Sequence, residues 1–149
     1  MNINYKKKIS LVLIIYRSEK ITKRFIKKIP KQLQTIIVEN SNNWKLKKEI
    51  EKKYKNIKFY IKKNNGVASS LNYAAKKIKT EYFIHISPDI KFDFRELDKF
   101  YNIAKEKKNN FSALGPRFTN VNKKSHIQIS KDLEIGSINS IHGSCMFIN

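Results

Sequence analysis

The stretch NNGVASSLNYAAKKIKTEYFIHISPDI, residues 64–90, contains a complete helix-to-strand unit. It begins with an Asn-Asn-Gly turn, where Gly66 can adopt backbone conformations that other residues avoid. Residues 67–78 carry small side chains that let a helix lie close to a sheet or a ligand. The apolar run at 81–87 predicts a strand buried on both faces, and the Pro-Asp pair that follows ends it at Asp89. This unit predicts a chain that alternates between helices and strands.

The rest of the chain continues the same alternation. Further strands are expected at 9–16, 34–40, 57–61, 111–116 and 144–148, with a weaker edge strand at 126–130, and further helices at 19–29, 44–55 and 94–107. Strands that alternate with helices of this length form βαβ units with right-handed crossovers. We therefore predict an α/β fold, a mostly parallel sheet flanked by helices, built as one domain over 1–149.

The composition is that of a folded but strongly basic protein. Its 149 residues are 40% hydrophobic, and 32 Lys and Arg stand against 12 Asp and Glu, giving a net charge of +20. Such a charge suggests an anionic partner, namely nucleic acid, a membrane surface or phosphorylated substrates. However, only four of the basic residues are Arg, and the abundant Lys, Ile and Asn all have AT-rich codons. Drift in base composition and selection for polyanion binding therefore both remain open explanations.

The sequence points to the cytoplasm. A single cysteine, Cys145, excludes an internal disulfide and fits a reducing compartment. The apolar run at 9–16 is too short for a membrane span, and no cleavage site for a signal peptide follows it. The chain stops at GSCMFIN, 143–149, in the middle of an apolar run. We therefore expect it to be truncated at the C-terminus.

Polar residues follow the predicted strands, and in parallel sheets ligands bind at these carboxyl ends. Glu39 could bind a base or ribose there, or it could cap the helix that follows. A helix that begins at Asn65 and Gly66 offers free N–H groups to a phosphate, and Asn72 lies within its first two turns. The candidate residues at these strand ends are Tyr16, Glu39, Asn65, Gly66, Asn72, Ser87 and Asp89.

Asp89 is the candidate metal ligand. A carboxylate held at the end of a strand could bind Mg²⁺ or Mn²⁺ and bridge it to substrate phosphates. The alternative is an Asx-type turn that prepares the next segment. His85 and Cys145 lie within predicted strands and are expected to be packing residues, whereas His142 remains a candidate residue on the ligand side. Zinc spacing, a Walker loop, GxGxxG and GxSxG are all absent from the sequence.

The ordered motifs ISLVLIIYRSEK, TIIVENSN, the stretch at 64–90, ALGPRF and IHGSCMFI resemble the family 2 glycosyltransferases of the GT-A fold. The resemblance covers nearly the whole chain from residue 9 and is most specific at 64–90. Each motif alone is weak, but their order and spacing match together. The resemblance implies an inverting transfer of a sugar from a nucleotide-diphosphate donor to a carbohydrate or lipid-linked acceptor, as in the synthesis of surface polysaccharides.

The resemblance also implies roles for individual residues. Glu39 stands where the family usually has an Asp that contacts the base, while Tyr16, Asn65, Gly66 and Asn72 fall in the donor-binding part. Asp89 matches the last acid of the Asp-x-Asp-like motif, which binds the divalent cation, Mg²⁺ or Mn²⁺, and the donor diphosphate. Ser87 replaces the first acid. Members with Asn-Pro-Asp here are associated with rhamnose or galactofuranose, which implies dTDP-, UDP- or GDP-linked donors.

Two other interpretations remain. In this family the catalytic base follows the strand at 144–148, so this chain offers no identifiable base and could be an inactive or truncated relative. A basic module that binds nucleic acid is the second alternative, but the lysines are spread over every predicted helix and no stacking motif is present. We expect no nucleic-acid partner. The charge could instead hold the protein at the inner face of an anionic membrane.

Overall fold

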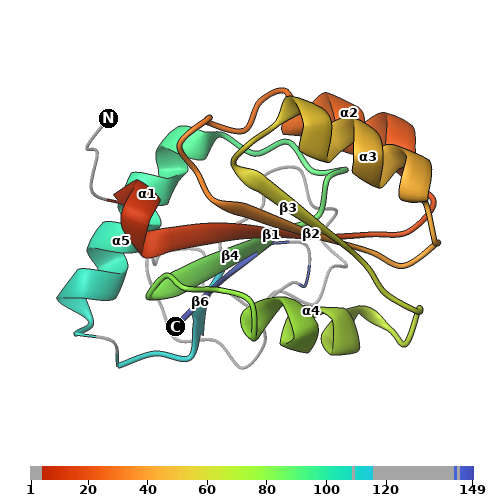
Figure 1. The fold of residues 1–149 in the computed structure, drawn as a ribbon. Helices are drawn as coiled ribbons and strands as arrows, with labels where there is room; N and C mark the ends of the chain where they lie inside the picture. The colour runs from red at the N-terminus through yellow and green to blue at the C-terminus, as the bar shows by residue number, and fades with distance from the viewer. Residues whose placement is uncertain (1–4, 109, 116–142, 144) are drawn as a thin grey trace, which may run out of the picture.

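The computed structural model describes residues 5–108, 110–115, 143 and 145–149, and it contains a six-stranded sheet with helices on both faces (Figure 1). The strand order is β3-β2-β1-β4-β6-β5. The strands are β1 (Ile9–Ile15), β2 (Thr35–Glu39), β3 (Ile57–Ile61), β4 (Tyr82–Ile86), β5 (Ala113–Leu114) and β6 (Cys145–Ile148). The predicted edge strand at 126–130 lies outside the described residues.

The sheet is mostly parallel, as the alternation of strands and helices predicts. β1 lies between β2 and β4 and is parallel to both, and β3 is parallel to β2. β6 runs antiparallel to β4 and to β5. The fold class is therefore confirmed. The antiparallel direction of β6 could not be predicted from the four residues of that strand.

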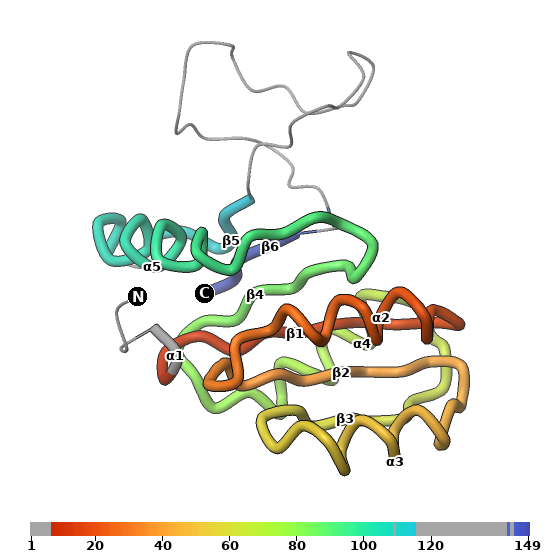
Figure 2. The backbone as a smooth tube through the Cα atoms, turned by 90° about the horizontal axis from the view of Figure 1, so that it is seen from above, coloured from red at the N-terminus to blue at the C-terminus, as the bar shows by residue number. Residues whose placement is uncertain are grey.

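Helices cover the two faces unequally (Figures 1 and 2). Helices α2, α3 and α5 lie on one face, and α4 lies on the other. All four expected helices are shorter than predicted. Helices α2 and α4 each end three residues early, α3 ends two residues early, and α5 begins three residues later than predicted. The short α1 was not expected. The helices are α1 (Tyr5–Lys8), α2 (Glu19–Ile26), α3 (Trp44–Lys53), α4 (Val67–Ala75) and α5 (Leu97–Glu106), with a 3₁₀ turn η1 (Phe94–Glu96) before α5.

Successive side chains of β1 point to opposite faces of the sheet, and each face has its own hydrophobic cluster. Ile9, Leu11, Leu13 and Ile15 face α2, α3 and α5, where the larger hydrophobic cluster lies. Val12 points to the opposite face, towards α4. On that side the fully buried Ala74 and Ser70 bring α4 close to the sheet, which is what the small side chains of this helix predict.

His85 and Cys145 are core residues, as expected. The His85 side chain is 2% exposed, and its Nδ1–H donates to the carbonyl of Val12 at 3.1 Å. Burial lowers the pKa of this imidazole. Cys145 is fully buried, and burial raises the pKa of its thiol to about 12. A thiol held neutral in this way is a poor nucleophile. His142 lies outside the described residues.

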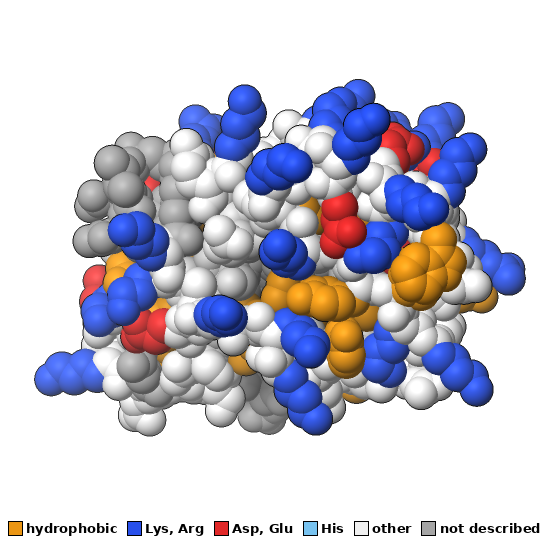
Figure 3. Space-filling model, in the orientation of Figure 1, with side chains coloured by type: hydrophobic (Ala, Val, Ile, Leu, Met, Phe, Trp, Pro, Cys, Tyr) orange, Lys and Arg blue, Asp and Glu red, His pale blue; other side chains and the backbone are white. Residues whose placement is uncertain are grey.

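Basic side chains are spread widely over the surface of the described residues. Figure 3 shows Lys and Arg side chains spread across one whole face of the molecule, with few acids between them. Some of these cations are paired, as where Lys23 bridges Glu19 at 2.8 Å and Glu49 at 2.6 Å and so joins α2 to α3. The basic side chains thus come from several elements and not from one, although α4 itself carries none.

Candidate functional site

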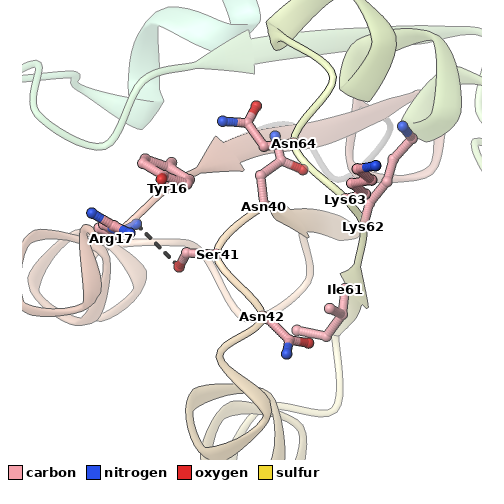
Figure 4. A pocket seen from close by; sticks show the side chains of 9 residues that line it. All are labelled: Tyr16, Arg17, Asn40, Ser41, Asn42, Ile61, Lys62, Lys63 and Asn64. Atoms are coloured by element: carbon pink, nitrogen blue, oxygen red, sulfur yellow. Dashed lines mark hydrogen bonds between the residues drawn. The ribbon is translucent and has the colours of Figure 1, made fainter.

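A cavity of about 460 Å³ opens where β1, β2 and β3 end. These strands are parallel, so the loops that follow them meet at one edge of the sheet. Figure 4 shows Tyr16 and Arg17 on one side of this cavity and Lys62 and Lys63 on the other. The lining residues are Tyr16, Arg17, Asn40, Ser41, Asn42, Ile61, Lys62, Lys63 and Asn64.

The loop after β1 is held in an unusual backbone conformation. Arg17 has φ 49°, a left-handed value that is uncommon for residues other than glycine. Its backbone N–H donates to Ser41 Oγ at 3.2 Å, which joins this loop to the one after β2. The guanidinium lies over the ring of Tyr16, 5.1 Å from its centre. These contacts place an aromatic ring and a cation together at the cavity.

Glu39 ends β2 and is 1% exposed. One carboxylate oxygen accepts from the backbone N–H of Ser41 at 2.8 Å and from the Ser41 hydroxyl, and the other accepts from the N–H of Asn43 at 2.8 Å. Asn43 in turn caps α3 by accepting from Leu46 N at 2.9 Å. Glu39 therefore organises the loop that leads into α3. A direct contact between Glu39 and a base stays a prediction.

Asn40 connects the same strand to α4. Its Nδ2 donates to Ser70 Oγ at 2.8 Å, and both side chains are buried. The Ser70 hydroxyl also lies 3.2 Å from the carbonyl of Gly66. The start of α4 is therefore fixed against the end of β2, so the two loops that border the cavity cannot shift independently.

The turn before α4 contributes Asn64 to the cavity. Asn64 Oδ1 accepts from the N–H of Gly66 at 3.2 Å, and Gly66 has φ 87° and ψ 166° at the N-cap of α4. That conformation is open only to glycine, which explains the residue type. The predicted residues Asn65 and Asn72 are exposed, and both lie outside the cavity lining.

Cations dominate the cavity. Lys62 Nζ donates to Ser69 Oγ at 3.0 Å, which holds this side chain beside the first turn of α4. Lys63 is exposed at the same edge, and Arg17 faces both lysines across the cavity (Figure 4). The carboxylate of Glu39, which ends β2 behind the cavity, accepts the hydrogen bonds described above. The arrangement suits an anionic ligand.

Ser87 and Asp89 follow β4, the neighbour of β1 on the side away from the cavity. Ser87 is half-buried and its carbonyl accepts from Ile90 N at 3.2 Å, whereas Asp89 is exposed in this turn. Within the described part of the chain, Asp89 belongs to no group of three His, Cys, Asp or Glu residues that could hold a metal. A lone carboxylate still fits Mg²⁺, because this ion takes most of its ligands from substrate phosphates and water.

Sequence reasoning identified the strand ends but only part of the lining. Of the candidate residues, Tyr16 lines the cavity. Glu39 and Gly66 form hydrogen bonds with residues that line it. Lys62 and Lys63 were missed because nothing separates them from the general lysine excess. Asn40 and Ser41 were visible as polar residues after β2 but were interpreted only as caps. Arg17, Asn40, Ser41 and Asn64 lie at or after the ends of predicted strands but were not chosen as candidates. The lining residues outside the candidate set are Arg17, Asn40, Ser41, Asn42, Ile61, Lys62, Lys63 and Asn64.

Comparisons with known proteins agree with this architecture. A solved structure of TarS residues 1–349 from S. aureus is similar with a TM-score of 0.54 and 24% identity, over 68% of this chain and 33% of that one. The chain thus spans about a third of the length of that protein. A search of curated proteins found no match. No helix among the described residues is long and apolar enough to span a bilayer.

The family model for glycosyl transferase family 2 matches residues 10–142, which is most of the sequence. The order of elements in the sheet and the GT-A fold of the similar structure are consistent with that match. The chain therefore belongs to glycosyl transferase family 2.

Proposed function

We propose that this protein binds a nucleotide-diphosphate sugar at the ends of β1, β2 and β3 and transfers the sugar to a carbohydrate or lipid-linked acceptor. The observation that carries the proposal is the cavity itself, which brings Arg17, Lys62 and Lys63 to one place at the carboxyl edge of a parallel sheet. Membership in glycosyl transferase family 2 supports a sugar nucleotide as the ligand.

Different residues bind different parts of the donor. Tyr16 presents an exposed ring on which a base can stack, and the cations attract the phosphates. Asp89, at the neighbouring strand end, would hold Mg²⁺ or Mn²⁺. When bound there, the divalent cation stabilises the negative charge that develops on the leaving diphosphate. The transfer inverts the anomeric carbon, and the general base that takes the acceptor proton is not assigned to any residue of this chain.

The finer specificity is also a proposal. We infer a hexosyl or deoxyhexosyl donor linked to uridine, deoxythymidine or guanosine diphosphate, with rhamnose and galactofuranose as the first sugars to test. The product belongs to a surface polysaccharide. We place the protein in the cytoplasm, with its lysine-rich surface at the inner face of an anionic membrane. Co-sedimentation with anionic but not with neutral vesicles tests this location.

The test of the proposal is a calorimetric and thermal-shift titration with uridine, deoxythymidine and guanosine diphosphates, each with and without Mn²⁺. At least one nucleotide should bind and raise the melting temperature, because a ligand that binds only the folded state stabilises it. If none of the three binds under either condition, the assignment of the cavity is wrong.

The variant Asp89→Ala tests the proposed metal site independently of the cavity. Asp89→Ala should abolish the increase in nucleotide affinity that Mn²⁺ produces, because this carboxylate is the proposed ligand. Asp98→Ala removes a carboxylate from α5 and should leave the effect of Mn²⁺ intact. An unchanged response to Mn²⁺ in Asp89→Ala would remove Asp89 from its proposed role.

A further inference from the structure

The asparagine side chains that line the cavity each use the amide oxygen in a hydrogen bond within the protein. Asn42 Oδ1 accepts from the indole N–H of Trp44 at 2.7 Å, and Asn64 Oδ1 accepts from the backbone N–H of Gly66 at 3.2 Å. Indole and backbone N–H groups can only donate, so the amide oxygens must be the atoms that face them. These bonds fix how the two amides are oriented, and the NH₂ groups of Asn42 and Asn64 can donate to a ligand.

Three other side chains at or behind the cavity also accept hydrogen bonds within the protein. Both carboxylate oxygens of Glu39 accept from the loop at 41–43. The hydroxyl of Ser41 donates to Glu39 and accepts from Arg17 N. Asn40 Nδ2 donates to Ser70 Oγ at 2.8 Å, and the amide oxygen of Asn40 lies 3.2 Å from the same hydroxyl. These hydrogen bonds hold the loops around the cavity in place.

Three of the side chains that line the cavity are cationic. Lys62 gives one hydrogen bond to Ser69 and keeps two N–H donors, and Lys63 has no partner among the described residues. The guanidinium of Arg17 is held over the Tyr16 ring, on the opposite side of the cavity from the two lysines (Figure 4). The lining thus surrounds a ligand with positive charge from two directions.

We propose that this donor-lined cavity binds the nucleoside diphosphate without any divalent cation, with Lys62, Lys63 and Arg17 supplying the positive charge. The inference rests on the proposed function and specifies how the same site recognises its ligand. Phosphate oxygens are strong acceptors, and hydrogen bonds from ammonium and guanidinium groups to them are about twice as strong as neutral ones. A metal ion at Asp89 then adds to an affinity that already exists.

The experiment is a calorimetric titration of uridine diphosphate in excess EDTA, repeated with Mn²⁺ in place of EDTA. Binding should persist in EDTA and should weaken as salt is added, because exposed charges are screened. The double variant Lys62→Gln, Lys63→Gln should lose about tenfold or more of the affinity in EDTA. Lys52→Gln, an equally charged position on α3 away from the cavity, serves as the control and should change the affinity by less than about twofold.

Uridine, which lacks phosphates, should bind more weakly and should not distinguish the double variant from the parent protein. Circular dichroism shows whether the variants are folded, and both lysines lie at a loop where their backbone bonds are kept. Binding that occurs only with Mn²⁺ would overturn the inference and leave the proposed function standing, whereas no binding with or without Mn²⁺ would overturn both. An equal loss in Lys52→Gln would assign the effect to bulk charge and also overturn the inference.

Discussion

Glu39 illustrates how a charged side chain can be almost completely buried at the end of a strand. Burying a carboxylate is costly unless hydrogen bonds replace its hydration. Here the donors come from Ser41 and Asn43, which lie two and four residues further along the same chain. Hydrogen bonds from nearby residues therefore offset the cost of removing this carboxylate from water. The same bonds hold the loop from which Ser41 and Asn42 reach the cavity.

Glu39→Gln should destabilise the protein and weaken nucleotide binding. The glutamine keeps one acceptor oxygen and directs an NH₂ group at backbone N–H donors, so buried donors lose their partner. We expect the free energy of unfolding to fall by about 1–3 kcal/mol in urea titrations. Glu49→Gln, which breaks an exposed ion pair with Lys23, is the control and should cost well under 1 kcal/mol. Equal effects of the two substitutions would contradict this interpretation.

His85 gives the stability a dependence on pH. Its pKa is lowered by burial, so below about pH 6.5 the unfolded chain binds a proton that the folded chain does not. The free energy of unfolding should therefore decrease as the pH falls from 7.5 to 5.5, with a limiting slope of about 1.4 kcal/mol per pH unit. Carboxylates with lowered pKa values, such as Glu19 and Asp93, change the free energy of unfolding only at lower pH, where they become protonated.

Urea unfolding at several pH values measures this slope, and NMR titration of the His85 ring measures its pKa directly. In His85→Gln the side-chain amide can still donate to the carbonyl of Val12 but does not titrate, so the slope between pH 7.5 and 5.5 should flatten. A ring that titrates near its ordinary value in the folded protein would contradict the expectation.

At the scale of elements, the fold could be predicted because the central strands are apolar at nearly every position. β1 and β2 are buried on both faces, and only a sheet covered by helices on both sides provides that environment. The direction of β6 could not be predicted in the same way. Its four residues fit either orientation, and its pairing with β4 and β5 depends on segments distant in sequence.

The site was less predictable because it depends on side-chain contacts between elements. Gly66 could be recognised from its residue type, since a turn before a helix often needs a positive φ. The hydrogen bond from Asn40 to Ser70 joins residues 30 positions apart, so no short stretch of the sequence indicates it. Lys62 and Lys63 differ from the other lysines only in their place at the end of β3, which becomes informative once the sheet order is known.

Gly66→Ala should test the connection between β3 and α4. A Cβ at this position would meet nothing within 4 Å, so the cost comes from the backbone and not from a clash. The conformation with φ 87° and ψ 166° is unfavourable for alanine by about 1–3 kcal/mol. Urea unfolding should show this loss, while Asn65→Ala, its neighbour with ordinary φ, should stay within about 0.5 kcal/mol. Equal stability of the two variants would show that α4 can begin differently.

At the scale of the whole molecule, the net charge of +20 makes two kinds of anion binding distinguishable. Polyanions would contact many lysines on the surface shown in Figure 3, and each neutralised phosphate adds to the salt dependence. A nucleoside diphosphate would contact only the few cations of the cavity. Its affinity should therefore depend much less steeply on salt.

We therefore expect duplex DNA to bind weakly at low salt and to be released as salt rises towards physiological strength, without sequence preference. Uridine diphosphate at saturating concentration should not displace it, because the DNA contacts lie over the whole surface and not in the cavity. Fluorescence anisotropy with a labelled duplex measures both effects, and Lys62→Gln, Lys63→Gln should weaken the nucleotide far more than the DNA. DNA binding that resists salt and competes with uridine diphosphate would favour a nucleic-acid site at the ends of β1, β2 and β3 instead.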